Sequence, residues 1–183
     1  MKITESELPG VYVINREPFI DDRGSFARVF CKRELEAIGL NGDLAQINLS
    51  TNIRKGTIRG LHSQKDSAAE DKIVTCVRGE VFDVCVDVRE GSPTYGAWVG
   101  EILSADNGLA LYVPKGFAHG YLTLTDDASV LYFVTQYYVP GAEVGYRYDD
   151  PAFGIKWLLP PPYIISEKDG SWPYVKQGAE ARA

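Results

Sequence analysis

The chain has 183 residues, 45% of them hydrophobic, and carries a formal net charge of −6 at pH 7. This length and composition predict one domain, residues 1–183, with a substantial core, and the acidic balance excludes a typical nucleic-acid binder. No apolar run approaches the roughly 18 residues of a membrane helix, and the first residues lack an apolar signal region, so we expect a cytoplasmic protein with no membrane partner.

Strand signals dominate the predicted elements. The first convincing element is a helix over residues 32–38, which Gly39 is expected to end. Segments rich in Val, Ile, Tyr and Phe follow at regular spacing, separated by Gly, Asp, Asn and Pro, which is typical of a sandwich or barrel. The predicted strands are residues 72–78, 80–89, 96–103, 109–113, 120–124 and 129–139. We expect residues 176–183 to form a loose tail.

The predicted strand over residues 80–89 (EVFDVCVDVR) has an apolar face and a partly polar face. Its apolar positions alternate with Asp83, Cys85 and Asp87, so these three side chains share one face. The polar face either points into a barrel that encloses a ligand, or it is a solvated outer face. The pattern favours neither alternative.

The two histidines of the chain are His62, in the segment RGLH, and His119, in the segment PKGFAH. Histidine is the side chain whose ordinary pKa lies nearest neutrality, so these positions are where proton transfer is most accessible. The candidate partners for acid–base chemistry are Lys72, Asp83, Tyr132 and Asp169. Each type also has an ordinary structural explanation: a strand tyrosine can be core, a lysine can extend its stem over apolar surface, and an aspartate can cap a turn.

The segment Pro114-x-Gly116-x-x-His119 resembles the second sequence motif of the cupin superfamily, a double-stranded β-helix or jelly roll. Metal-binding cupins use three histidines and a glutamate, and two of the histidines form a His-x-His pair. Here His62 is followed by Ser63 and Gln64, whereas a catalytic metal needs at least three protein ligands. The resemblance therefore implies an all-β, cupin-type jelly roll with a few short peripheral helices and no metal. The cysteines Cys31, Cys76 and Cys85 lack CxxC spacing and are expected to be reduced and mostly buried.

An ordered series of segments between Asp22 and Asp169 resembles the dTDP-4-dehydrorhamnose 3,5-epimerase family of nucleotide-sugar epimerases. The matching segments are DRGSF (22–26), QINLS (46–50), GTIRGLH (56–62), KIV (72–74), DVR (87–89) with SPT (92–94), GFAHG (116–120), DP (150–151) and SEKD (166–169). A single segment of this kind carries little weight, but the series is specific because it covers most of the chain in order.

The resemblance implies a role for each site residue. His62 would be the catalytic base, made more basic by Asp169, with Tyr132 as the acid on the opposite face of the sugar and Lys72 near the ketone oxygen. Tyr138 falls where an aromatic ring stacks on the nucleotide base. The other positions expected to bind substrate are Arg23, Phe26, Gln46, Asn48, Arg59, His119, Glu143 and Lys168.

The implied activity is inversion of C3, C5 or both in a nucleotide-diphospho-4-keto-6-deoxyhexose, without a cofactor. The expected substrate is dTDP-4-dehydro-6-deoxy-D-glucose and the product dTDP-4-dehydro-L-rhamnose. Family members are homodimers that exchange strands, so Arg23 and Phe26 would complete the partner's site.

The sequence departs from the family pattern at Arg28, Ser63 and Phe133 and in the acidic loop 65–71, which leaves the nucleotide and the sugar open. The alternatives are a 3,4-ketoisomerase on the same scaffold and a non-catalytic nucleotide-sugar-binding cupin. A metal-dependent oxygenase is disfavoured because the chain has two histidines.

Overall fold

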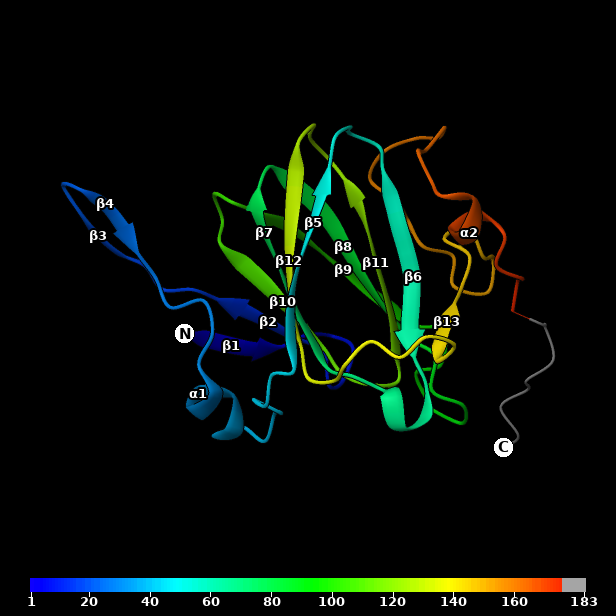
Figure 1. Cartoon of the computed structure of the whole chain (residues 1–183), viewed down its shortest axis with the longest axis horizontal. Helices are drawn as coiled ribbons and strands as arrows, with labels where there is room; N and C mark the ends of the chain where they lie inside the picture. Colours follow the sequence, from blue (N-terminus) through cyan, green and yellow to red (C-terminus); the bar gives the residue numbers. More distant parts are fainter. Residues whose placement is uncertain (176–183) are drawn as a thin grey trace.

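The computed structural model describes residues 1–175, and nearly all of their regular structure is β-strand. Six strands form an antiparallel sheet in the order β1–β2–β10–β7–β12–β5. Their bounds are β1 Lys2–Glu5, β2 Tyr12–Asn15, β10 Leu109–Val113, β7 Lys72–Arg78, β12 Ala128–Val134 and β5 Gln46–Asn52. Five strands form a second antiparallel sheet in the order β13–β6–β11–β8–β9 (Figure 1). Their bounds are β13 Glu143–Gly145, β6 Ile58–Gln64, β11 Phe117–Thr123, β8 Glu80–Asp87 and β9 Trp98–Ser104.

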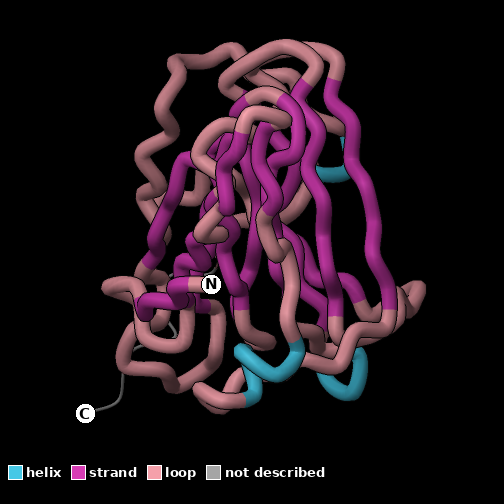
Figure 2. Tube along the Cα trace, turned by 90° about the vertical axis from the view of Figure 1, so that its left-hand side faces the viewer, coloured by secondary structure: helices cyan, strands magenta, loops and turns pink. Residues whose placement is uncertain are grey.

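The two sheets are stacked as layers, and the short helices lie outside them (Figure 2). These are α1 (Lys32–Glu36), η1 (Asp66–Ala68) and α2 (Glu167–Gly170), so the predicted all-β class with a few short peripheral helices is confirmed. A separate hairpin of β3 (Phe19–Asp21) and β4 (Gly24–Phe26) projects away from the layers (Figure 1). The expected tail, residues 176–183, lies outside the described residues.

No helix within residues 1–175 is long and apolar enough to cross a membrane. All three cysteines are free, and two of them, Cys76 and Cys85, are buried, in agreement with the prediction.

Apolar packing covers both faces of each sheet. Between the sheets, side chains such as Val74 form one core. A second core lies on the outer face of the five-stranded sheet, where residues 146–165 cover Val84 and its neighbours. A third lies on the outer face of the six-stranded sheet, where Leu35 of α1 packs with Phe133. Strands covered on both faces read as continuous apolar runs, which is why the central strands were predictable.

The polar face of β8 points into the protein. Asp83 and Asp87 are both 0% exposed and share the face of Cys85, which belongs to the core between the sheets. The polar face therefore points inward and the solvated outer face is wrong, but its aspartates pair with His119 and Arg89 and do not line a ligand cavity. The apolar face of β8 is the outward one, and residues 146–165 keep it from water.

The predicted bounds are confirmed for β7 and β10 and differ by up to three residues for β8, β9 and β11. The strand predicted over residues 129–139 is wrong beyond Val134. From there, backbone N–H groups donate to side chains instead of a neighbouring strand: Tyr138 N to Gln46 Oε1 (2.9 Å) and Val139 N to Gln64 Oε1 (2.8 Å). These bonds bring Tyr138 across the end of the sheet.

The predicted helix over residues 32–38 is shorter in the structure and ends at Glu36. Gly39 adopts φ +81°, and Leu40 N donates back to Leu35 O at 3.0 Å. This is the left-handed turn by which glycine commonly closes a helix, so the role predicted for Gly39 holds although the helix stops earlier.

Candidate active site

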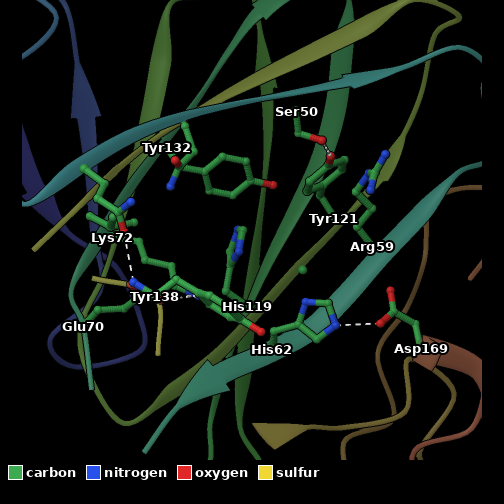
Figure 3. Close-up of a pocket in the computed structure, with 14 residues that line it drawn as sticks. Ser50, Arg59, His62, Glu70, Lys72, His119, Tyr121, Tyr132, Tyr138 and Asp169 are labelled. Carbon is green, nitrogen blue, oxygen red and sulfur yellow. Dashed lines mark hydrogen bonds and ion pairs between the residues drawn. The ribbon is translucent and has the colours of Figure 1, made fainter. Parts of the chain in front are cut away.

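A cavity of about 320 Å³ opens between the two sheets, with polar side chains on both walls (Figure 3). Strands β5, β7 and β12 of the six-stranded sheet supply one wall, and β6 and β11 of the five-stranded sheet supply the other. Nine of the residues predicted from the family resemblance line the cavity: Gln46, Asn48, Arg59, His62, Lys72, His119, Tyr132, Tyr138 and Asp169.

A bulge in β6 turns both Arg59 and His62 into the cavity. On the paired strand β11, His119 faces His62 and Tyr121 faces Arg59, so three steps along β6 match two along β11. Residues three apart in a regular strand point to opposite faces, and the extra residue brings Arg59 back to the face of His62. Gly60 permits this geometry, because it has φ +110° and a Cβ there would lie 2.7 Å from the His119 carbonyl oxygen.

His62 is held by a carboxylate from α2. Its Nε2 lies 2.6 Å from Asp169 Oδ1, and Gly60 N donates to Asp169 Oδ2 at 3.3 Å. Burial pushes the pKa of the Asp169 carboxyl upward, but the hydrogen bond and charge of His62, with smaller contributions from Gly60 and Ser166, leave that pKa below its ordinary value. Because an ionised carboxylate only accepts, this hydrogen bond selects the tautomer of the neutral ring in which Nε2 carries the proton and Nδ1 has the lone pair.

Tyr132 lies on the opposite wall, and its hydroxyl points into the cavity (Figure 3). Burial raises the pKa of this hydroxyl well above its ordinary value, and the neighbouring Tyr121 and Asp83 act in the same direction. Tyr132 is therefore a neutral proton donor at physiological pH. Its ring packs edge-on against His119, with 6.0 Å between ring centroids.

Lys72 begins β7 and extends into the cavity with a side chain that is 12% exposed. Its Nζ lies 3.3 Å from Oε1 of Glu70, a second cavity-lining residue whose side chain is 11% exposed. A partly enclosed ammonium of this kind can stabilise negative charge that develops on a bound molecule.

His119 is fixed from behind by a carboxylate of its own. Its Nε2 lies 2.8 Å from Asp83 Oδ1, and both side chains are almost fully buried. Both histidines are thus paired with carboxylates, and within residues 1–175 no three His, Cys, Asp or Glu side chains are grouped to hold a metal ion.

Strand β5 supplies neutral polar groups. Gln46, Asn48 and Ser50 alternate along it and line the cavity, while Ile47 and Leu49 face away and are 56% and 62% exposed. Amide and hydroxyl groups of this kind can donate to and accept from sugar hydroxyls.

Arg59 projects from the facing strand, and its Nε donates to Asn52 Oδ1 at 2.7 Å. Within residues 1–175 the two terminal nitrogens make no hydrogen bond, so they can bind an anion in the bidentate manner of a guanidinium.

Four predicted substrate residues lie outside the lining. Glu143 stands at the rim, with its Oε1 3.8 Å from His62 Nδ1 and its Oε2 paired with Lys168. Arg23 and Phe26 lie on the projecting β3–β4 hairpin, where Phe26 is 79% exposed, so they do not reach the cavity of their own chain.

Five further lining residues were not predicted as site residues: Ser50, Glu70, Gly120, Tyr121 and Val134. The acidic character of loop 65–71 was the available signal for Glu70. Tyr121 is 1% exposed and its hydroxyl bonds Ser50 Oγ at 2.9 Å, so in sequence it resembled an ordinary core residue.

None of the departures from the family pattern at single positions lines the described cavity. Arg28 pairs with Glu34 at the surface, Ser63 is buried, and the buried Phe133 stacks on Phe30.

A jelly roll that encloses a histidine–carboxylate pair and a facing tyrosine defines a cupin-type enzyme equipped for acid–base chemistry. The family model of dTDP-4-dehydrorhamnose 3,5-epimerase matches residues 5–177. The enzyme of that name from Sinorhizobium fredii is 46% identical over 163 residues, which are 89% of this chain and 84% of that protein.

Solved structures agree with this match. The dTDP-4-dehydrorhamnose 3,5-epimerase of Bacillus anthracis, crystallised with TDP and PPi, superimposes with a TM-score of 0.91 at 39% identity, covering 95% of this chain and 99% of that one. The Legionella pneumophila 3,5-epimerase, in complex with dTDP-4-keto-L-rhamnose, superimposes with a TM-score of 0.89 at 39% identity, covering 94% of this chain and 92% of that one. The chain belongs to the dTDP-4-dehydrorhamnose 3,5-epimerase family, and it is an isomerase with the cupin-type fold predicted.

Proposed function

We propose that this enzyme inverts C3 and C5 of dTDP-4-dehydro-6-deoxy-D-glucose and so forms dTDP-4-dehydro-L-rhamnose. The observation that carries the proposal is the placement of His62 and Tyr132 on opposite walls of one cavity. The family supports the substrate class, because one relative's structure holds the corresponding keto-sugar nucleotide and another holds TDP.

His62 is the proposed base, acting through Nδ1. Its Nε2–H is committed to Asp169 at 2.6 Å, so Nδ1 is the nitrogen that can take a proton from the sugar. The Asp169 carboxylate then stabilises the imidazolium that forms, as the buried aspartate does in serine proteases. A positioned base of this kind contributes about 10²–10⁴-fold to the rate.

Lys72 and His119 are the proposed stabilisers of the intermediate. A hydrogen beside the C4 ketone is a weak carbon acid, and its removal leaves negative charge on the ketone oxygen. The Lys72 ammonium, held in the cavity beside Glu70, can meet that charge without reorganisation. His119, fixed by Asp83, is placed on the facing strand to contact the same region of the sugar.

Tyr132 is the proposed acid. Inversion requires a proton on the face opposite the one deprotonated, and Tyr132 comes from the sheet opposite His62. The raised pKa keeps its hydroxyl protonated, so it can donate.

The nucleotide end is proposed to lie at the cavity mouth. Tyr138 is 58% exposed there and offers a ring face for the base, while Arg59 and Lys168 supply positive charge for the diphosphate. The acidic net charge of the chain does not oppose this, because cationic groups focused near the cavity decide the local field. The enzyme is proposed to act in the cytoplasm.

Exchange with solvent deuterium tests the proposal. Wild-type enzyme with the keto-sugar in D₂O should place deuterium at C3 and C5, as seen by NMR, and His62→Ala should abolish it. Tyr132→Phe should lose full inversion while retaining exchange at C3 or C5. Undiminished exchange by His62→Ala would remove His62 as the base, and complete epimerisation by Tyr132→Phe would remove Tyr132 as the acid.

The same spectra separate the alternatives. A 3,4-ketoisomerase would move the carbonyl to C3, which changes the carbonyl carbon in the ¹³C spectrum. A binding-only cupin would be stabilised thermally by the ligand, with no deuterium uptake.

We further propose that the enzyme is a homodimer in which the β3–β4 hairpin reaches the partner's cavity. Phe19, Ile20 and Phe26 on this hairpin are 68–79% exposed, and the edge strand β5 exposes Ile47 and Leu49. Exposed apolar side chains gathered on a projecting hairpin and a free sheet edge are typical of an interface between copies. Arg23 would then enter the partner's substrate site.

Mixing two inactive variants tests this arrangement. A heterodimer of His62→Ala and Arg23→Ala chains contains one site with both residues intact, so activity should return to about a quarter of wild type after random exchange. The matched control, His62→Ala with Tyr132→Phe, damages both sites and should recover no full inversion. Absence of recovery from the first pair, with dimers seen by sedimentation, would show that Arg23 acts within its own chain.

A further inference from the structure

Glu70 is a carboxylate in the cavity to which the proposed mechanism assigns no role. It follows η1 and lines the same wall region as Lys72, with Oε1 3.3 Å from the Lys72 ammonium. The other carboxylate that lines the cavity, Asp169, already uses both oxygens, for His62 and for Gly60. Within residues 1–175, the Lys72 ammonium is the one charged partner of the Glu70 carboxylate, so its remaining acceptor positions are available to a bound ligand.

Hydrogen bonds of neighbouring residues hold the loop that carries Glu70. The loop is fixed on one side by Gln64, whose Nε2 donates to Ala68 O, and on the other by Asp71, whose N donates to Thr135 Oγ1 at 2.8 Å. Asp71 Oδ1 also accepts from Lys115 N at 3.0 Å. A carboxylate placed in a cavity by its neighbours, with free acceptor positions, is suited to binding a ligand rather than to holding the loop together.

Lys72 Nζ and Glu70 Oε1 lie 3.3 Å apart, so the two groups can contact neighbouring oxygens of one sugar ring. Lys72 can only donate, which suits the C4 carbonyl oxygen, and an ionised Glu70 can only accept, which suits a hydroxyl. The hydroxyl beside the C4 carbonyl is the one on C3. A hydroxyl that donates to a carboxylate forms a charge-assisted hydrogen bond, which is about twice as strong as a neutral one.

We propose that Glu70 accepts a hydrogen bond from the C3 hydroxyl of the substrate and is a specificity-determining residue of this enzyme. It selects 4-keto sugars that carry oxygen at C3 and, with Lys72, sets the position of C3 and C4 relative to His62. Glu70 has this role only if the proposed function holds, so the experiment must separate the two.

Deuterium uptake at C5 provides that separation, because it can be followed whether or not C3 carries oxygen. We compare dTDP-4-keto-6-deoxyglucose with its 3-deoxy analogue and measure kcat/KM for exchange at C5 with wild type, Glu70→Gln and Glu70→Ala. Wild type should prefer the hydroxylated sugar by about 10–100-fold, the range of a hydrogen bond to a charged group. Glu70→Ala should bring the ratio of kcat/KM for the hydroxylated and 3-deoxy sugars close to 1. Glu70→Gln, which still accepts through its amide oxygen, should give a ratio between those of wild type and Glu70→Ala.

Asp66→Asn is the matched control, since Asp66 is exposed on the same loop and the substitution removes the same charge outside the cavity. It should leave the preference at the wild-type value. If both Glu70 variants lose activity equally on the two sugars, Glu70 only anchors Lys72 and the proposal is overturned. If wild type exchanges deuterium into neither sugar, the proposed function has failed instead.

Discussion

Replacement of Asp169 by asparagine isolates the step that makes His62 a base. The carboxylate accepts two hydrogen bonds, from His62 Nε2 at 2.6 Å and from Gly60 N at 3.3 Å. Asparagine has one acceptor oxygen. If that oxygen stays with Gly60, the amide NH₂ faces Nε2 and drives the imidazole proton to Nδ1, which blocks the nitrogen that must take the substrate proton. If the amide oxygen stays with His62, the amide NH₂ faces the Gly60 N–H, and two donors then face each other without a hydrogen bond.

Either orientation also removes the negative charge behind the imidazolium. We therefore expect kcat for deuterium exchange to fall by about 10²–10⁴-fold, the usual contribution of a positioned base, which corresponds to roughly 3–5 kcal/mol of barrier. Serine proteases lose about 10⁴-fold from the equivalent change. The fold should survive, because the substitution preserves shape and the Asp169 backbone bond to Ser166 Oγ remains.

The assay is time-resolved NMR of deuterium at C3 and C5, with thermal unfolding measured alongside. Asp127→Asn is the control: this exposed aspartate pairs weakly with Arg78 at 3.5 Å, and its positive φ of 53° is one that asparagine tolerates. A loss below threefold in Asp169→Asn, with the control active, would refute the role of Asp169 in setting the tautomer of His62.

Three further predictions concern backbone strain, acid stability and alkaline activity. Gly60→Ala should lower Tm more than Gly56→Ala. Both positions have positive φ, which costs about 1–3 kcal/mol for a residue with a side chain, but only at Gly60 does the added Cβ lie 2.7 Å from backbone atoms. Equal decreases in Tm for the two variants would contradict this. Asp87→Asn should lower the free energy of unfolding at pH 7 by about 1–3 kcal/mol, since the buried carboxylate accepts from Arg89. Burial pushes the pKa of Asp87 upward, but hydrogen bonding holds that pKa far below its ordinary value. The stabilisation is therefore present above about pH 4 and is lost as pH falls further. Urea unfolding should show a smaller difference in the free energy of unfolding between wild type and Asp87→Asn at pH 3 than at pH 7. The raised pKa of Tyr132 predicts that kcat for deuterium exchange does not decline through about pH 10, where an ordinary tyrosine ionises. A decline of this kcat near pH 10 in wild type that is absent in Tyr132→Phe would contradict the prediction.

The two strands whose bounds were predicted correctly, β7 and β10, are mostly apolar on both faces. β7 and β10 are covered on each side by a core, so their runs of Val, Ile and Leu could be recognised without knowing the fold. β5 was not recognised as a strand, because its alternation of polar and apolar side chains is opposite to the usual one, in which apolar side chains face inward. Its inward side chains are polar because they line the cavity, and its outward Ile47 and Leu49 are exposed. A strand that lines a polar ligand cavity is therefore difficult to predict from its hydrophobicity pattern.

Nine of the residues predicted as site residues line the cavity, and the family resemblance, not their spacing, identified them. Arg59 and His62 are three residues apart, which in a regular strand places them on opposite faces. Only the bulge at Gly60 brings them together. The isolated glycine within this strand was the available signal for a bulge, but it does not say which side chains the bulge redirects. Glu70 and Tyr121 were missed because a loop carboxylate and a strand tyrosine have common structural roles, and only their placement in the cavity distinguishes them.

The layered architecture itself suits the inversion chemistry. An epimerase must remove a proton from one face of a ring and deliver one to the other, so its base and acid need separate and rigid supports. Here the proposed base, His62, stands on β6 of one sheet and the proposed acid, Tyr132, on β12 of the other, and each sheet is packed on its far side by a core of its own. The distance between base and acid is thereby set by packing between the sheets, and not by any flexible loop. Substitutions in the core between the sheets, such as Val74→Ala, should accordingly reduce inversion more than simple exchange, because exchange needs only the base to be in place.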